Sequence, residues 1–248
     1  MKKYKLTTET LQFAGRTLHR IKAVKDFDSI KAGEFGGWIE NEKNLSQDDN
    51  AWIYGNAMVF DNAMVFDNAK VYGNANVSGN AKVYGNANVS DYANVFGNAN
   101  VSDYANVSDY AEVYGNANVS DYANVFGNAE VYDYANVSDY AKVYGNAEVY
   151  GNANIYYYAK VFGNAVIKGD AIVHDAVDYI VFKNFWSSGR YFTWTSSNNK
   201  WSVGCFYGTG EELIKKAYAD SEKSGREYER VVRYVESILA DEKKEKSN

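Results

Sequence analysis

The stretch Ala81–Tyr92 reads AKVYGN followed by ANVSDY, and these two hexapeptides are typical of the unit that decides the fold. Ala recurs at every sixth position from Ala51 to Ala171, which makes 21 copies. Val or Ile follows each Ala two positions later, from Ile53 to Val173, without exception. A period of six does not keep one face of a 3.6-residue helix apolar, so this stretch is not helical.

The spacing instead predicts a mainly β protein built on a parallel β-helix. Gly-Asn and Asp-Tyr pairs end most hexads, and Gly, Asn and Asp tolerate tight or left-handed turns. A short strand, a turn and an inward Ala, repeated three times, close a triangular coil of 18 residues, as hexapeptide repeats do. The hexads of residues 51–176 therefore predict a single-stranded β-helix of about seven coils with Ala and Val in its core.

Residues 1–50 predict an N-terminal β-hairpin cap. Leu11 to Val24 carry alternating and β-branched residues around the turn Ala14-Gly15. An open end of a β-helix exposes backbone groups and core side chains, so a capping segment is expected there. Ile39, Leu45 and Ala51 are spaced by six, which indicates that the coil begins before the regular repeat.

After Val173 the period ends, and residues 177–240 predict a small β-meander with helices. Residues 178–185, 190–195 and 200–206 read as three strands separated by Ser, Gly and Asn turns. Thr209 and Glu212 have the spacing of a capping box, and apolar residues follow at helical intervals. The charged residues 241–248 predict a disordered tail.

Composition narrows the class of protein. The chain has one Cys, 23 Tyr, no Pro and a net charge of −6. Residues 51–176 hold 5 Lys and 13 Asp or Glu, so the repeat lacks the basic surface that nucleic acid needs. No apolar run is long enough for a membrane span or a signal peptide. We expect a cytoplasmic protein, or a virion-associated one if a phage encodes it, with neither nucleic acid nor membrane as a partner.

Residues 18 apart should stack on one side of the coil. The stacking predicts an aromatic ladder of Phe96, Tyr114, Tyr132 and Tyr150 and an amide ladder of Asn100, Asn118, Asn136 and Asn154. It also predicts a solvated acidic stripe of Glu112, Glu130 and Glu148. The ladders either only stabilise the coil, or form an oligomer interface or a carbohydrate platform.

The tryptophans of the C-terminal region also allow two interpretations. Trp186, Trp194 and Trp201 could stack on sugars as a glycan-binding surface, or they could fill the core of a small domain. The second interpretation is the ordinary one for large aromatic residues in a domain of this size.

The repeat resembles the hexapeptide repeat of left-handed β-helix proteins, with its aliphatic residue and a small residue four places later. Together with residues 15–46 (GRTLHRIKAVKDFDSIKAGEFGGWIENEKNLS), it resembles YdcK-type hexapeptide-repeat proteins of bacteria and phages; residues 191–214 resemble a C-terminal module attached to such repeats. The resemblance implies a left-handed coil. Members often carry acyltransferase labels, but a shared fold does not carry an activity with it.

The resemblance directs attention to histidines, because hexapeptide acyltransferases generally use a coil histidine as general base beside loops inserted between hexads. Here no loop interrupts the hexads, and the two histidines are His19 and His174. Asp175 and Cys205 are the further candidates near the C-terminal end, although a lone Cys in an apolar strand is usually buried. No metal spacing and no cofactor motif is present, so neither a metal nor a cofactor is expected.

The sequence thus favours a non-enzymatic structural or interaction protein with a rigid, acidic, aromatic-laddered surface. Self-association as a homotrimer or dimer is the expected assembly, with a protein or glycan partner as a further expectation. Two alternatives stay open: an acyltransferase-like protein with a site near His174, and a glycan-binding or phage-associated binding module.

Overall fold

The computed structural model describes residues 2–186 and 189–246. They divide into two compact units, one ending at Asp178 and the other beginning at Tyr179. The N-terminal hairpin belongs to the same unit as the repeat. Each unit is described by itself below.

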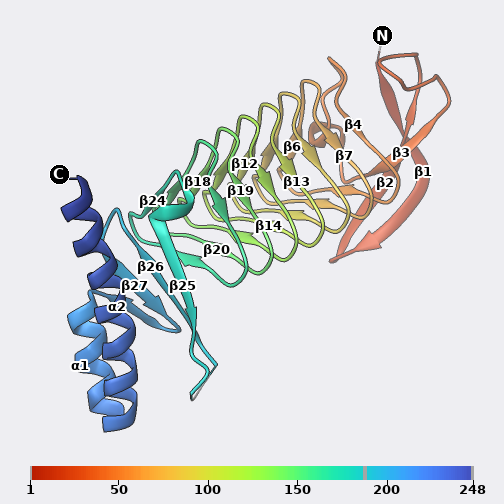
Figure 1. The fold of residues 1–248 in the computed structure, drawn as a ribbon. Helices are drawn as coiled ribbons and strands as arrows, with labels where there is room; N and C mark the ends of the chain where they lie inside the picture. The colour runs from red at the N-terminus through yellow and green to blue at the C-terminus, as the bar shows by residue number, and fades with distance from the viewer. Residues whose placement is uncertain (1, 187–188, 247–248) are drawn as a thin grey trace. The chain divides into compact units, whose positions relative to one another are not determined.

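The first unit is a parallel β-solenoid, whose coils follow one another from orange to green in Figure 1. Each hexad contributes one two-residue strand, and every third strand pairs in parallel with the one 18 residues before it. Three sheets result, which we call sides 1, 2 and 3.

Side 1 continues from β3 (Phe35–Ile39) through β5 (Met58–Val59), β8 (Asn76–Val77), β11 (Asn94–Val95), β14 (Glu112–Val113), β17 (Glu130–Val131), β20 (Glu148–Val149) and β23 (Val166–Ile167). Side 2 consists of β6 (Met64–Val65), β9 (Lys82–Val83), β12 (Asn100–Val101), β15 (Asn118–Val119), β18 (Asn136–Val137), β21 (Asn154–Ile155) and β24 (Ile172–Val173). Side 3 consists of β4 (Trp52–Ile53), β7 (Lys70–Val71), β10 (Asn88–Val89), β13 (Asn106–Val107), β16 (Asn124–Val125), β19 (Lys142–Val143) and β22 (Lys160–Val161).

The solenoid has about eight turns, one more than the regular hexads alone predict. The additional turn comes from β3, whose Ile39 pairs with Val59, and from Leu45, which bridges to Val65. The predicted early start of the coil is therefore confirmed. Ile39 and Leu45 occupy the register of Val rather than of Ala, because Leu45 lies eight residues before Ile53 instead of six.

The core is the one that the hexad predicts. The Ala and Val or Ile of every hexad are fully buried, as at Ala93 and Val95. Each corner turns at the residue after the outward position, which has a positive φ, for example 73° at Gly97 and 58° at Asp103. Gly adopts this conformation freely, and Asp is among the few other residues that tolerate it.

Several of the Asp corners also join neighbouring coils. The Asp109 carboxylate accepts a hydrogen bond from the Gly127 N–H at 3.0 Å, and that of Asp139 accepts one from the Tyr157 N–H at 2.9 Å. Each such bond satisfies a backbone N–H of the next coil. Tyr157 is the exception at these corners, because it holds a φ of 55° that a bulky side chain rarely adopts.

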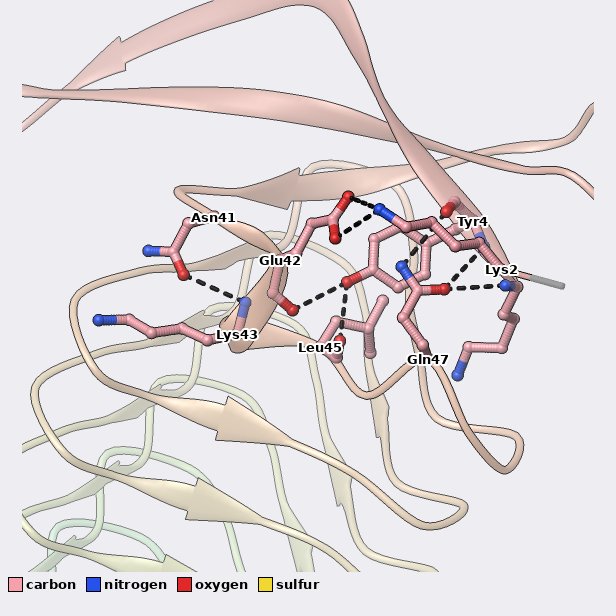
Figure 2. A network of polar contacts seen from close by, with 8 residues as sticks. Lys2, Tyr4, Asn41, Glu42, Lys43, Leu45 and Gln47 are labelled. Carbon is pink, nitrogen blue, oxygen red and sulfur yellow. Dashed lines mark hydrogen bonds and ion pairs between the residues drawn. The ribbon is translucent and has the colours of Figure 1, made fainter.

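The N-terminal cap is the predicted hairpin of β1 (Tyr4–Phe13) and β2 (Arg16–Ala23), which pair antiparallel and extend side 1 through β3. Figure 2 shows how its first residues seal the first turn of the coil. The Tyr4 hydroxyl lies 2.7 Å from the Leu45 carbonyl oxygen and 3.1 Å from that of Glu42, next to the short 3-10 helix η1 (Glu42–Asn44). The Gln47 side-chain oxygen accepts the N–H groups of Lys3 and Tyr4.

Lys3 completes this cap from inside the protein. Lys3 is 1% exposed. Its ammonium group donates to the carbonyl oxygens of Ala51 at 2.8 Å, Asp48 at 3.0 Å and Asp49 at 3.4 Å. Burial lowers the pKa of Lys3 to about 8, so the group is still protonated at neutral pH and has three N–H donors. The backbone acceptors at the open end of the coil thus find a partner.

The short 3-10 helix η2 (Ala176–Asp178) ends the first unit, and the second unit has an antiparallel sheet and two helices. The sheet consists of β25 (Tyr179–Lys183), β26 (Tyr191–Thr195), β27 (Lys200–Val203) and β28 (Phe206–Gly208). The predicted third strand is two strands, because Gly204, with a φ of 54°, turns the chain back. The helices are α1 (Gly210–Asp220), which begins with the predicted Thr209–Glu212 capping box, and α2 (Glu222–Lys246).

The predicted disordered tail from residue 241 is wrong over most of its length. α2 continues to Lys246, since the Lys and Glu of this segment are good helix formers. Residues 247–248 of that prediction lie outside the described residues.

Candidate functional site

The predicted aromatic ladder of side 1 forms. Phe96, Tyr114, Tyr132 and Tyr150 stack with ring centroids 4.8, 4.8 and 4.5 Å apart and nearly parallel planes. The four rings are half-buried against the neighbouring strand residues. Such stacking stabilises adjacent strands, so this ladder has a structural role whatever else it does.

The acidic stripe lies beside this ladder, with Glu112, Glu130 and Glu148 in register on adjacent strands. The predicted solvated stripe is only partly solvated, because phenol groups of the ladder reach it. The Tyr114 hydroxyl donates to Glu130 at 3.0 Å, and Tyr132 donates to Glu148. Burial, and then these carboxylates and neighbouring phenols, raise the pKa of both tyrosines.

We expect Glu148→Gln to stabilise the solenoid at neutral pH by about 0.5 kcal/mol, within the usual range for like charges on adjacent strands. Burial, followed by the charge of Glu130, raises the pKa of Glu148. The pKa of Glu148 is higher in the folded than in the unfolded chain. Glu148 therefore does not destabilise the fold at pH values below its ordinary pKa, where it is protonated in both states, and it destabilises the fold increasingly as the pH rises above that value. Urea denaturation at pH 3.5 and pH 7 measures the difference.

The matched control for this stripe is Glu112→Gln, because Glu112 also has Glu130 as its single acidic neighbour. Its other neighbour is the polar Asn94, whereas that of Glu148 is the apolar Val166, so Glu112→Gln should have the smaller effect. A stabilisation by Glu148→Gln that is equal at both pH values would contradict the account of the stripe.

A second row of four aromatic residues, more exposed than the ladder of side 1, was not singled out in the sequence. Tyr104, Tyr122, Tyr140 and Tyr158 stack at the corner between sides 2 and 3, with centroids 4.9, 4.9 and 5.1 Å apart. Their exposed fractions are 51, 46, 48 and 73%. We call them the Tyr104 row. The available signal was their place in the hexad, since the residue before Ala lies at a corner, whereas the residue after Val lies on a flat side.

Two further stacks lie nearby. Tyr92 and Tyr110, 51 and 60% exposed, stack at 5.1 Å on the corner that follows side 3. Phe126, Tyr144 and Phe162 stack on side 3 itself, with centroids 4.9 and 5.4 Å apart.

The predicted amide ladder is in register, and a side-chain hydrogen bond links its members at the step from Asn118 to Asn136. Asn118 donates to Asn136 at 3.0 Å, whereas Asn100 and Asn154 donate to backbone carbonyls two residues before them. A continuous amide chain instead joins the corner after side 1, from Asn62 through Asn80 and Asn98 to Asn116, with bonds of 3.1, 3.0 and 3.0 Å.

His174 directly follows β24, the last strand of side 2, and its partner is Asp178 rather than the adjacent candidate Asp175. The His174 Nδ1 lies 2.9 Å from an Asp178 carboxylate oxygen, which also accepts the backbone N–H groups of His174 and Asp175. The ring stands edge-on to Tyr156 at 5.7 Å and is 48% exposed. An oriented imidazole of this kind can accept or donate a proton.

His19 lies on β2, where its Nδ1 is 3.4 Å from the Thr7 carbonyl oxygen of β1. His19 thus belongs to the N-terminal hairpin, whereas His174 follows the last strand of the solenoid. The structure does not bring the two histidines together, because the regular hexads separate them.

The structure contradicts one expectation for the second unit and supports the core interpretation for two of its tryptophans. Cys205 is exposed in the turn between β27 and β28, not buried in a strand. Trp194 and Trp201 are 3 and 2% exposed and form the core with Phe192, Leu213 and Val232, among others. Trp186 is half-buried against the same core. Two of the three tryptophans therefore have no ring face available to a sugar.

Among the described residues, no group of three or more His, Cys, Asp or Glu side chains is placed to hold a metal ion. No helix within that part of the chain combines the length and the apolar character that a membrane crossing requires.

Comparison with known proteins supports the resemblance that the hexad repeat indicates. No family model matches the chain. In an alignment over 69 residues, the chain is 39% identical to a protein of Escherichia coli (strain K12) described as "Uncharacterized acetyltransferase YdcK". The chain resembles a YdcK-type hexapeptide-repeat protein. The matched segment makes up 24% of this chain and 21% of the relative, so the chain spans about a fifth of that protein's length.

Proposed function

We propose that the chain is a non-enzymatic interaction protein, in which the solenoid acts as a rigid scaffold and its exposed Tyr104 row contacts partners. The observation that carries the proposal is the Tyr104 row, four stacked rings of which each is at least 46% exposed. Contiguous exposed aromatic surface of this kind marks interaction sites in soluble proteins.

The regularity of the coil supports a scaffold. Every hexad from Ala51 to Val173 contributes a strand in register with its neighbours, and no loop projects between them to shape an enclosed site. A partner would therefore meet extended rows of side chains. The expected first partner is a second copy of this chain, because symmetric self-association covers exposed apolar surface most simply.

Light scattering coupled to size exclusion tests self-association. The mass should be a multiple of the 27.8 kDa of one chain, and Tyr122→Ser with Tyr140→Ser should lower it. Tyr92→Ser with Tyr110→Ser is the matched pair from another corner. A mass of one chain at every concentration up to the solubility limit would contradict self-association.

A second candidate function, an acyltransferase-like activity, is favoured by one observation. His174 is held by Asp178 through Nδ1, as a general base is held by a carboxylate, and the E. coli relative is named an acetyltransferase. The hypothesis requires acetyl-CoA binding and an acetyl transfer that His174→Ala abolishes. Asp178→Asn should then reduce the same transfer, whereas Asp175→Asn should leave it intact.

A further inference from the structure

A groove of about 570 Å³ follows the Tyr104 row along four coils. One wall is the row itself, and the other is the line of outward residues on side 3, which consists of Asn106, Asn124, Lys142 and Lys160. Each coil thus contributes one tyrosine and one amide or ammonium group. No carboxylate is among the lining residues, although the repeat as a whole is acidic.

The stacking determines what the tyrosines can offer. Within the row the ring planes lie within 9° of parallel, so neighbouring rings cover one another's faces. Ring edges remain, and these carry the positive end of the aromatic quadrupole, together with the phenol groups. Tyr158 ends the row, because Ala176 occupies the equivalent position one coil further on. The groove therefore favours a ligand rich in oxygen atoms over an apolar one.

The lysines indicate the charge of that ligand. Lys142 and Lys160 are exposed and directly in register on β19 and β22. An anion bound between or above two ammonium groups is attracted to both of them. The charged end of the groove is thus complementary to a carboxylate-bearing ligand.

The periodicity indicates a polymer. Equivalent groups recur every 4.9 to 5.1 Å along the row. An extended peptide presents equivalent side chains only every two residues, about 6.6 Å, and therefore loses register with the coils. A sugar unit in an extended polysaccharide has nearly the length of one coil, so successive units can meet successive subsites.

We propose that this groove binds an extended acidic polysaccharide, with carboxylates at Lys142 and Lys160 and with sugar hydroxyls that donate to the side-chain oxygens of Asn106 and Asn124. The amide nitrogens of these two residues already donate within the protein, to the Tyr104 and Tyr122 carbonyl oxygens. The proposal rests on the proposed role of the solenoid as a binding scaffold and adds the class of ligand. It does not depend on self-association.

Titration calorimetry with carboxylated oligosaccharides tests it, with hexamers of galacturonate and of mannuronate as probes and the methyl ester of each hexamer as its uncharged match. Both acids should bind the intact chain at least tenfold more tightly than their esters. Lys142→Gln with Lys160→Gln should remove that preference. Tyr122→Ser with Tyr140→Ser should weaken binding of acid and ester alike.

The control variants keep the result specific. Lys82→Gln, an exposed lysine of side 2, and Tyr92→Ser with Tyr110→Ser, a stack of similar exposure, should bind like the unaltered chain. Circular dichroism of each variant confirms the fold. No binding of either acid, or equal losses of binding in the control variants, would overturn the proposal. Binding of poly-glutamate with the same dependence on the two lysines would also overturn it and would indicate an acidic peptide as the ligand.

Light scattering on the same samples separates the two proposals. If the chain binds the acids while its mass is that of one copy, the proposed polysaccharide groove is supported and self-association is rejected. A multimer that binds neither acid would do the reverse.

Discussion

Val83→Asp should lower the free energy of unfolding of the solenoid by about 4 kcal/mol or more. Val83 is fully buried on β9, between Val65 and Val101 of the neighbouring coils. A carboxylate there has no hydrogen-bonding partner, because Ala, Val and Ile fill the coil interior, and an unpaired buried charge is among the most destabilising changes known. Urea denaturation followed by circular dichroism measures the loss.

The adjacent residue of the same strand supplies the control. Lys82 is exposed on the opposite face of the same strand. Lys82→Asp therefore introduces the same side chain into solvent and should change the free energy of unfolding by no more than about 0.5 kcal/mol. Similar losses for the two variants would mean that β9 does not alternate between core and surface.

Lys3→Met should have the second large effect, a loss of about 3 kcal/mol. The substitution keeps most of the side-chain volume but removes the donor for the carbonyl oxygens of Asp48, Asp49 and Ala51. A buried acceptor left without a donor costs about 1 to 3 kcal/mol, and the substitution removes the Lys3 donor from three carbonyl oxygens at once. The same denaturation measurement, together with hydrogen exchange of the first coils, detects the loss.

Lys2→Met is the matched control, because the neighbouring lysine forms an exposed ion pair with Glu42 at 2.6 Å. Exposed pairs contribute little, so this variant should stay within about 1 kcal/mol of the unaltered chain. If Lys3→Met and Lys2→Met were equally mild, Lys3 would not seal the open end of the solenoid.

The sequence predicted the coil because its constraint is local and repeated. Ala and Val can fill a narrow triangular core, and Gly or Asp can adopt the corner conformation, so every hexad independently indicates the same answer. The stacking of Phe96 on Tyr114 follows from the 18-residue coil alone.

Contacts between segments remote in sequence could not be predicted in the same way. Lys3 looks like a surface residue in the sequence, yet it is buried because the hairpin places it against residues 48–51. Asp178, after the repeat has ended, reaches back to His174 through η2, a turn that no hexad position anticipates.

The exposed surface was harder to predict than the core. The hexad pattern directed attention to the flat-side ladder, yet its Tyr132 is half-buried beside Glu148, whereas the corner residue Tyr140 is 48% exposed. The difference arises because a corner side chain has no neighbouring strand residue on its outer flank. The groove along the Tyr104 row depends on that difference.

The 18-residue register underlies every row of side chains discussed above, and engineered cysteine pairs test it most directly. In a Cys205→Ser background, Asn100→Cys with Asn118→Cys places two thiols on paired strands, where a spacing of about 4.8 Å suits a disulfide. Asn100→Cys with Asn106→Cys places them on different sides of the coil. Mild oxidation should cross-link the first pair and leave the second reduced; a cross-link in the second pair alone would contradict the solenoid.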